Sequence, residues 1–392
     1  MKTITDTKKI NEILTRGVDK IIEKGHLERQ LLSGKQLTIY FGIDPTSPVL
    51  HLGHSIILRK LAKFQELGHR VILLIGDFTA RIGDPTDKQA TRQPLSQAQV
   101  KANMRDYKKQ AGKILDFTKV ELKYNSVWLG KLNFEQILEI ASHLSVPKLL
   151  TRDMFEKRLR EGKTISLHEF LYPLMQGYDS VAMDVDLEIA GADQLFNMLV
   201  GRDLQKTYNN KDKDVLTTKL LIGTDGQKMS KSLGNTIALT EDPKEIFGKI
   251  MSIKDELISN YIELCTDLPI KEQAIKADPR TAKVLLAKEI IKMYHSEKQA
   301  LEAEKEFNKI FRDKEMPENM PEWQAGKGEY GILDLLFESG LTASKAEAKR
   351  MILGRAVEIN GQVKTDWQEK IKIENDTVIQ VGKRKWLRLK IK

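Results

Sequence analysis

Two apolar segments separated by an amphipathic stretch lie near the start of the chain. Residues 37–43 (LTIYFGI) and 70–75 (RVILLI) have the composition of short buried strands, and residues 53–67 carry apolar side chains at the spacing of one helix face. Strand, helix and strand at this separation predict a βαβ unit, and hence an α/β fold whose parallel sheet binds ligands at the carboxyl ends of its strands. Further strand candidates are residues 120–124, 186–189 and 215–222.

Composition excludes several classes of protein. The 392 residues are 41% hydrophobic and 30% charged, which supplies a large core and excludes whole-chain disorder. No apolar run approaches the ~18 residues of a membrane span, and no secretory signal is visible at the start, so we expect a cytoplasmic protein with no membrane partner. The single cysteine, Cys265, excludes a disulfide framework and fits a reducing compartment.

Changes in composition along the chain predict its domains. We expect an α/β domain over residues 1–240, a helical domain over 241–312, a linker over 313–328 and a small α+β module over 329–392. The linker contains Pro317 and Pro321 but no Val, Ile or Leu. Residues 281–311 are predicted to form one long amphipathic helix, and the last module is predicted to contain helices at 332–338 and 345–354 and a strand at 356–359.

Positive charge is concentrated at the C-terminal end. Residues 330–392 contain 13 Lys and Arg against 8 Asp and Glu, so they carry more than half of the formal net charge of +9. This excess favours an anionic partner such as nucleic acid, although a solvated basic surface is the ordinary interpretation of a charge run alone.

The first segment with chemical meaning is residues 51–54 (HLGH), between the first strand and the first helix. His51 and His54 could bind a metal, but no third ligand lies nearby, and two surface histidines are an equally ordinary interpretation. The segment follows a strand end, where the N–H groups of a helix N-terminus suit a phosphate. Gly53 would let a flat ring approach the backbone, and imidazole N–H groups would stabilise charge on a phosphoryl group.

The second segment is residues 228–232 (KMSKS), between Gly226 and Gly234. A lone pair of lysines at this spacing is usually a solvated basic loop. The flanking glycines give the loop freedom to move, and two lysines three residues apart suit a polyphosphate.

Together, the two segments resemble the HIGH and KMSKS signatures of class I aminoacyl-tRNA synthetases, with Leu52 in place of the usual Ile. The resemblance extends to the bacterial tyrosyl-tRNA synthetases through residues 40–46 (YFGIDPT), 75–85 (IGDFTARIGDP), 172–179 (YPLMQGYD) and 191–194 (GADQ). Residues 344–350 (SKAEAKR) and 359–361 (ING) resemble an S4 RNA-binding domain. The resemblance covers nearly the whole chain and implies a Rossmann-like catalytic domain with a helical insertion, a helical anticodon-region domain and an S4-like domain.

The resemblance implies a tyrosine–tRNA ligase that works in two steps. The carboxylate of L-tyrosine attacks the α-phosphate of ATP and releases pyrophosphate, and the 3′-terminal adenosine of tRNA(Tyr) then attacks the tyrosyl-adenylate. Because the first nucleophile is already an anion, no protein general base is required, and catalysis comes from positioning and charge stabilisation. The catalytic residues implied by the resemblance are His51, His54, Thr46, Lys228 and Lys231, and the ATP-binding residues are Gly53, Gly191, Asp193, Met229 and Lys231.

The tyrosine-binding residues implied by the resemblance are Tyr40, Asp84, Tyr172, Gln176, Asp179 and Gln194. Tyr40 and Asp179 would read the phenolic hydroxyl, because a ligand without that hydroxyl leaves buried polar groups unpaired. The spacing of Tyr172, Gln176 and Asp179 places them on one helix face, as it would in any amphipathic helix. The sequence departs from the family at Ala190, where a second glycine is usual, and its methyl group is expected near the ribose site.

The S4-like module is expected to contact RNA through basic side chains, or to carry them as a charged edge that prevents aggregation. The RNA-binding candidates are Lys345, Lys349, Arg350, Arg355 and Lys385. The family also implies Mg²⁺ bound with ATP, although the sequence shows no dedicated metal site. It implies a homodimer through the helical insertion near residues 134–159, where the apolar side chains fit an interface and a core equally well.

Three other functions compete with this interpretation. A tryptophanyl-type synthetase is disfavoured by Tyr40 and Asp179, because an indole needs no pair of hydroxyl partners. A non-enzymatic RNA-binding protein on the same scaffold is disfavoured by the intact histidine and lysine segments. A nucleotidyltransferase with the same histidine helix is disfavoured by the helical middle region and the S4-like module.

Overall fold

The computed structural model describes residues 3–85, 95–227, 229, 234–311, 320–382 and 385–391. The chain divides into two compact units, residues 1–301 and residues 302–392. Within the described ranges, no helix combines the length and the apolar character that crossing a membrane requires.

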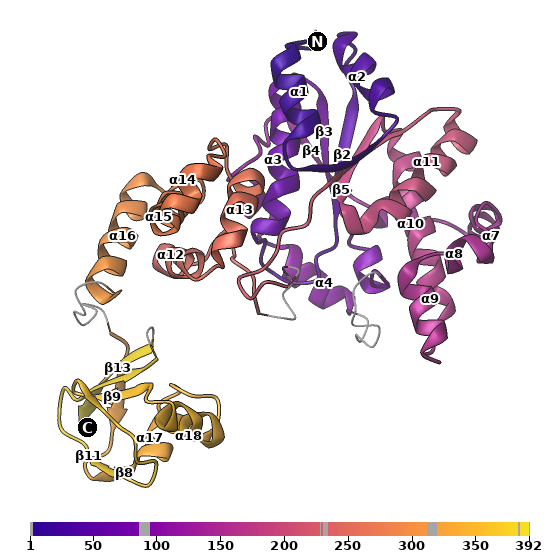
Figure 1. Ribbon diagram of the computed structural model, residues 1–392. Coiled ribbons are helices and arrows are strands. Elements are labelled where there is room, and N and C mark those ends of the chain that lie inside the picture. Colours follow the sequence, from indigo (N-terminus) through magenta and orange to yellow (C-terminus); the bar gives the residue numbers. More distant parts are fainter. Residues whose placement is uncertain are drawn as a thin grey trace. The chain divides into compact units, whose positions relative to one another are not determined.

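The first unit is built on a six-stranded sheet with the order β1-β6-β5-β2-β3-β4. Figure 1 labels its strands β2, β3, β4 and β5. Its strands are β1 (Val18–Ile22), β2 (Thr38–Ile43), β3 (Arg70–Ile75), β4 (Val120–Tyr124), β5 (Leu187–Gly191) and β6 (Asp214–Thr218). All neighbouring pairs are parallel except β1 with β6, which is antiparallel. The predicted α/β fold with a parallel sheet is therefore confirmed, and the order reverses beside β2, which is where ligands bind in such sheets.

Burial explains which strands the sequence revealed. All five residues of β5 are buried, as are five of the six in β3; β3 is a continuous apolar run after Arg70, and β5 is apolar except for Glu188. The edge strand β1 (VDKII) is half-exposed and includes two charged residues, and no periodicity in the sequence predicted it.

Helices surround this sheet and continue beyond it (Figure 1). They are α1 (Thr7–Thr15), α2 (Lys24–Leu32), α3 (Leu52–Glu66), α4 (Gln97–Met104), α5 (Tyr107–Ala111), α6 (Ser126–Leu129), α7 (Phe134–Ser142), α8 (Val146–Leu150), α9 (Asp153–Arg160), α10 (Leu167–Met183), α11 (Leu195–Asn209), α12 (Pro243–Met251), α13 (Ile258–Cys265), α14 (Glu272–Ala277), α15 (Pro279–Tyr294) and α16 (Glu297–Phe311). The single helix predicted over residues 281–311 is wrong, because α15 ends at Tyr294. Ser296 Oγ accepts from the N–H of Gln299 at 3.2 Å, and this N-cap starts α16 as a separate helix.

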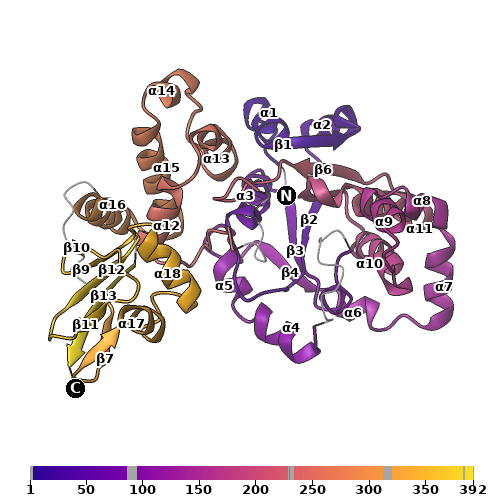
Figure 2. The same cartoon turned by 60° about the horizontal axis from the view of Figure 1, so that its bottom comes forward.

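The second unit contains the last part of α16, a five-stranded sheet, a two-stranded sheet and two further helices (Figure 2). The elements are β7 (Glu322–Ala325), β8 (Glu329–Gly331), α17 (Ile332–Glu338), α18 (Lys345–Leu353), β9 (Val357–Ile359), β10 (Gln362–Val363), β11 (Lys370–Lys372), β12 (Val378–Val381) and β13 (Lys385–Ile391). Both helices pack on the sheet through one apolar core, in which Leu335, Ile352 and Ile379 are fully buried. The predicted α+β character of this region is thus seen in the structure.

One segment of the expected linker is a strand. Residues 322–325 form β7, which pairs in parallel with β13, and Ala325 is fully buried. The Pro- and Gly-rich composition of residues 313–328 hid this strand, because its stability comes from hydrogen bonds to a partner more than 60 residues away in the sequence.

Candidate active site

Polar groups gather where four neighbouring parallel strands end. Asp44 follows β2, Gly76 follows β3, Asn125 follows β4, and Gly191 is the last residue of β5. The carboxyl ends of parallel strands lie at one edge of a sheet, so these positions share the edge at which α/β proteins bind ligands.

Asp44 connects two of these strand ends to helix α10. Its carboxylate accepts from Tyr172 Oη at 2.9 Å and from Thr79 Oγ1 at 2.7 Å. Burial, together with the nearby charges of Asp84 and Asp77, raises the pKa of Asp44 to about 7, although the hydrogen bonds from Thr79 and Tyr172 oppose this shift. Gly76 permits this arrangement, because a Cβ at that position would lie 1.9 Å from Asp44 Oδ1.

Asp179 is a buried carboxylate held in place by two donors. Its oxygens accept from Trp128 Nε1 at 2.7 Å and from Asn125 Nδ2 at 3.2 Å. Asn125 also donates to Thr79 Oγ1 at 3.0 Å, so Asp179 and Asp44 belong to one hydrogen-bonded network. Burial raises the pKa of Asp179 well above its ordinary value, since the charged form loses hydration.

Tyr40 lies beside Asp179 in the structure but bonds elsewhere. The Tyr40 hydroxyl is 2.9 Å from Ser180 Oγ, the residue that follows Asp179 in α10. Tyr40 is 1% exposed, and Glu188 is its cross-strand partner on β5. The negative charges of Glu188 and Asp179, together with burial, raise the pKa of the Tyr40 hydroxyl well above its ordinary value.

The remaining tyrosine-site candidates form a second chain of contacts. Gln176 Nε2 donates to Glu188 at 3.0 Å, and Gln176 Oε1 accepts from Asn197 Nδ2 at 2.8 Å. Asn197 Nδ2 also donates to Gln194 Oε1 at 3.0 Å, and Gln194 Nε2 donates to Asp84 at 2.6 Å. Each of the six residues expected in the tyrosine site therefore takes part in a hydrogen bond at the carboxyl edge of the sheet or on the facing helix α10.

The two histidines shape the start of helix α3. His51 Nδ1 accepts from the N–H of Gly53, and His54 Nδ1 accepts from the N–H of His51, each at 3.1 Å. A neutral imidazole that accepts at Nδ1 carries its proton at Nε2, so both rings present an Nε2–H donor. Gly53 accommodates the His51 ring itself, since a Cβ there would lie 2.9 Å from His51 Cε1.

The segment that follows residues 228–232 lies against the histidine helix. The N–H of Leu52 donates to Ile237 at 2.9 Å, and the N–H of Leu239 donates to Leu50 at 2.9 Å. Met229 is buried, and its N–H donates to the carbonyl of Leu221. Lys228 and Lys231 lie outside the described residues.

At the end of β5, position 191 has no room for a side chain. A Cβ at Gly191 would lie 2.6 Å from Asp193 Oδ1 and 3.0 Å from Leu220. The side chain of Ala190 is buried and belongs to a core cluster with Met198 and Val215, and its expected place near the ribose site stays a prediction. Thr46 lies two residues beyond Asp44, to whose carbonyl its N–H donates at 2.8 Å.

The RNA-binding candidates lie in the second unit. Lys345 pairs with Asp334, Lys349 Nζ lies 3.7 Å from the centroid of the Trp367 ring, and Lys385 Nζ donates to Leu341 at 2.8 Å. Arg350 and Arg355 are exposed. Lys345, Lys349 and Arg350 come from α18, and Arg355 is the second residue after this helix.

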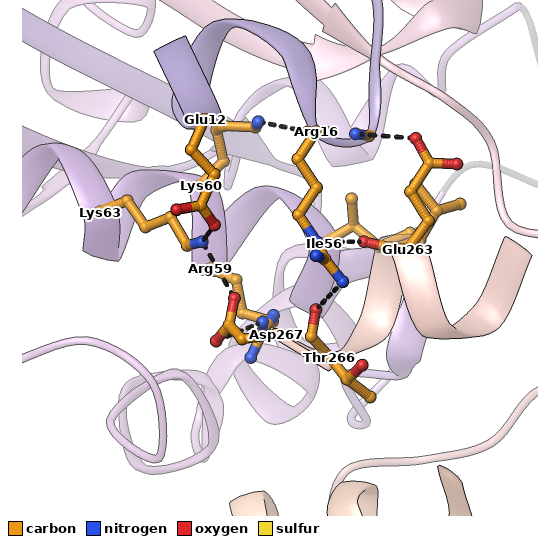
Figure 3. A pocket seen from close by; sticks show the side chains of 11 residues that line it. Glu12, Arg16, Ile56, Arg59, Lys60, Lys63, Glu263, Thr266 and Asp267 are labelled. Carbon is orange, nitrogen blue, oxygen red and sulfur yellow. Dashed lines mark hydrogen bonds and ion pairs between the residues drawn. The ribbon is translucent and has the colours of Figure 1, made fainter. Parts of the chain in front are cut away.

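A small cavity of about 30 Å³ lies elsewhere in the first unit, among α1, α3 and α13 (Figure 3). Charged side chains line it, and they pair with one another: Lys63 bonds to Glu12 at 2.5 Å and to Asp267 at 2.9 Å. Arg16 and Lys60 donate to backbone carbonyls at the ends of α13 and α1. Because these groups satisfy the exposed helix termini, the cavity is part of the packing of the unit.

Sequence reasoning missed several residues of the site. They are Asp44, Thr79, Asn125, Trp128, Ser180, Glu188, Asn197 and Lys213. Asn125 had a usable signal, because it directly follows a predicted strand. Lys213 had none, since it lies in a charged run (KDKD) that is typical of a solvent-exposed turn.

Comparisons with known proteins identify the family of the chain. A family model for class I tRNA synthetases (W and Y) matches residues 32–312, and a model for the SYY-like C-terminal domain of tyrosine–tRNA ligases matches residues 313–389. The chain is 45% identical to a tyrosine–tRNA ligase of Moorella thermoacetica, over 96% of this chain and 94% of that protein. It is 47% identical to a tyrosine–tRNA ligase of Carboxydothermus hydrogenoformans, over 98% of both.

A solved structure of a tyrosyl-tRNA synthetase has a similar fold. The C-terminally truncated mitochondrial tyrosyl-tRNA synthetase of Aspergillus nidulans superimposes with a TM-score of 0.66 at 25% identity, covering 77% of this chain and 94% of that one. The fold, the two signature segments and the family match define a class I aminoacyl-tRNA synthetase. Within that class the chain belongs to the tyrosine–tRNA ligase family, whose reaction depends on ATP.

Proposed function

We propose that the polar site at the carboxyl edge of the sheet binds L-tyrosine with its phenolic hydroxyl at Asp179. The observation that carries this assignment is that Asp179 is 3% exposed and held by Trp128 and Asn125. A phenolic O–H donates to such an acceptor, whereas phenylalanine leaves it desolvated and without that donor. Tyr40, whose pKa is raised by burial and by the charges of Glu188 and Asp179, would close the phenol end of this site.

The amino group of the bound tyrosine is assigned to the other end of the face of α10 that carries Asp179. The Tyr172 hydroxyl donates a hydrogen bond to Asp44, and the lone pairs of its oxygen can therefore accept from the ammonium group of the substrate. Gln176, Asp84 and Gln194 complete this end, and the negative charge of Asp84 favours the charged amine.

ATP is assigned to the turns around α3 and β5. His51, His54 and Thr46 would contact the phosphates, and Lys228 and Lys231 would close over the pyrophosphate. Donors of this kind lower the barrier when they reach charge that develops in the transition state. Gly53, Met229, Gly191 and Asp193 complete the nucleotide site, with Asp193 accepting from the ribose hydroxyls.

Mg²⁺ is assigned to the phosphates of ATP. Among the described residues, no cluster of three His, Cys, Asp or Glu side chains could hold a metal ion. Mg²⁺ commonly keeps several waters and binds through substrate phosphates, so this edge needs no dedicated cage. The ion would neutralise phosphate charge, while the positioning of both substrates remains with the side chains named above.

The second unit is assigned to tRNA(Tyr). Lys345, Lys349, Arg350, Arg355 and Lys385 would supply the salt-dependent attraction to phosphate that dominates affinity for nucleic acid. Arg350→Glu should weaken tRNA binding and reduce its dependence on salt, with tyrosyl-adenylate formation unchanged. Lys327→Glu, an exposed site outside this set, is the matched control.

A homodimer is assigned to the exposed apolar face of α7 and α8. Phe134, Leu138 and Val146 are 75%, 55% and 57% exposed, while Ile140 and Leu144 fill the core beneath them. A second copy of the chain would remove this face from water.

We further propose a cytoplasmic location and domain limits of 1–240, 241–312, 313–328 and 329–392, with residues 322–325 added to the last domain.

The test of the activity is ATP–pyrophosphate exchange with each of the twenty amino acids. We expect exchange with L-tyrosine and background exchange with phenylalanine. Exchange with tryptophan in place of tyrosine would support the tryptophanyl alternative. Exchange with no amino acid, in a chain that still binds tRNA, would support a non-enzymatic RNA-binding protein.

A further inference from the structure

A fully buried lysine lies between the two ends of the proposed tyrosine site. Lys213 is 0% exposed, and its ammonium group donates to Glu188 and, at 2.9 Å, to Ser180 Oγ. Ser180 bonds to the hydroxyl of Tyr40, and Glu188 accepts from Gln176. Lys213 thus links a residue of the phenol end to a residue of the amino end, although it was not predicted in either group.

The packing around Lys213 is specific for this side chain. The ammonium lies 6.0 Å from the centroid of the Tyr40 ring. The π-face of an aromatic ring attracts a cation at such a distance. A Cβ at Gly201 would lie 2.6 Å from Lys213 Nζ, so the glycine in α11 leaves the space that the lysine occupies. Burial lowers the pKa of Lys213, and the charge of Glu188 opposes that shift.

The ion pair of Lys213 and Glu188 sets the directions of the hydrogen bonds made by the Gln176 amide. A lysine ammonium only donates and an ionised carboxylate only accepts. While Glu188 is ionised, Gln176 must turn Nε2 toward it, and Gln176 Oε1 then faces the Nδ2 of Asn197. If Glu188 became neutral, either orientation of the Gln176 amide could pair with it, and the amide would no longer be fixed.

We infer that Lys213 is a positioning residue for the amino acid: through Glu188 and Ser180 it fixes the Gln176 amide and the Tyr40 hydroxyl. This inference rests on the proposed function, in which Tyr40 and Gln176 face bound tyrosine. A buried ion pair contributes little net stability compared with apolar side chains of the same volume. The role of the pair is therefore to keep one arrangement of the site before the substrate binds.

Lys213→Met tests the inference, because methionine keeps the length of the side chain and removes the charge. The matched control is Lys60→Met, since Lys60 is another buried lysine of the first unit, and its ammonium donates to the backbone carbonyls of Ile13 and Arg16. Pyrophosphate exchange would be measured against tyrosine and against ATP. Active sites would be counted from the burst of tyrosyl-adenylate, and thermal melting would report stability.

We expect Lys213→Met to raise KM for tyrosine by about fivefold or more, with KM for ATP and kcat per active site changed by less than about twofold. Lys60→Met should lower the melting temperature and leave KM for tyrosine unchanged. If Lys213→Met also lowers the melting temperature but leaves KM for tyrosine within about twofold, the lysine is only structural and the inference is overturned.

A second variant keeps the test decisive if Lys213→Met does not fold. Glu188→Gln combined with Lys213→Met removes both charges, and the new amide can meet Gln176 in either orientation. The inference predicts that KM for tyrosine stays raised in this double variant, and a normal KM overturns it. If the wild-type chain itself shows no tyrosine-dependent exchange, the proposed function fails instead, whatever the variants do.

Discussion

The indole N–H of Trp128 donates to a carboxylate oxygen of Asp179 at 2.7 Å. Trp128 comes from the short helix after β4 and Asp179 from the middle of α10, so the contact joins two segments that are 51 residues apart in sequence. It aims a buried carboxylate from the helix toward the carboxyl edge of the sheet. In the proposed tyrosine site, the preference for tyrosine over phenylalanine depends on this carboxylate accepting a hydrogen bond from the phenolic hydroxyl.

Asp179→Asn replaces an acceptor-only group with an amide. One of its two polar atoms then becomes a donor that faces Trp128 or Asn125, which are donors themselves. We expect KM for tyrosine to rise by about tenfold or more and the preference for tyrosine over phenylalanine to fall. Exchange kinetics with both amino acids would measure this. Asp184→Asn, at the exposed C-cap of the same helix, is the control, and equal effects at the two positions would show that the phenol assignment is wrong.

Gly76→Ala should damage the network at Asp44. The new methyl group would lie 1.9 Å from Asp44 Oδ1 and 2.4 Å from Thr79 Oγ1, so the carboxylate must leave its position. We expect a loss of about 2 kcal/mol or more of unfolding free energy, measured in urea, because overpacking and a broken buried bond add together. Gly248→Ala in α12 meets no atom within 4 Å and should be neutral or slightly stabilising.

The raised pKa of Asp44 predicts a dependence of stability on pH. The folded chain holds a proton on Asp44 up to a pKa of about 7, whereas the unfolded chain releases it near the ordinary value of 3.8. Stability contributed by Asp44 is therefore fully present below the unfolded value and is lost as the pH rises toward 7. Urea unfolding of the wild type and of Asp44→Asn from pH 4 to pH 8 would show the wild type losing stability relative to the variant. Parallel curves for the two proteins would contradict the shift.

Leu138→Asp should separate the proposed dimer. A charge on the apolar face of α7 cannot be buried against a second copy without a large desolvation cost. Light scattering of the wild type should give twice the chain mass of 44.7 kDa, and the variant should give the single mass. Leu285→Asp changes a leucine of similar exposure on α15 and should leave the dimer intact. A wild-type chain that is already monomeric would remove the proposal.

Lys231→Ala tests the role assigned to the lysine segment. The lysine is proposed to reach charge on the pyrophosphate, so its loss should slow activation by about tenfold or more while tyrosine binds normally. Pyrophosphate exchange and equilibrium binding of tyrosine would separate the two effects. Lys206→Ala on α11 is the control for loss of an exposed lysine. An exchange rate within about threefold of the wild type would refute the role.

Local patterns were enough to predict the main elements of the first unit. The strands β2 and β3 are nearly continuous apolar runs, β4 (VELKY) alternates apolar and charged residues, and α3 shows its apolar face directly in the spacing of its side chains. Burial on both faces of a parallel sheet imposes such runs, so they can be read without knowing any partner. The strands β1 and β7 are short and partly exposed, and only their pairing partners make them strands.

The amino-acid sequence by itself determined the parallel sheet, the two signature segments and the type of residue at each candidate position, because these depend on neighbours along the chain. Tertiary structure alone decided that the Tyr40 hydroxyl meets Ser180, that Trp128 holds Asp179, and that Lys213 is buried in the site. The physical reason is that hydrogen-bond direction and burial depend on atoms brought together from distant segments. From the sequence, a lysine in a charged run such as that of Lys213 is expected to be exposed to water. Only the folded structure supplies the buried counter-charge of Glu188 and the space beside Gly201 that allow this lysine to be buried.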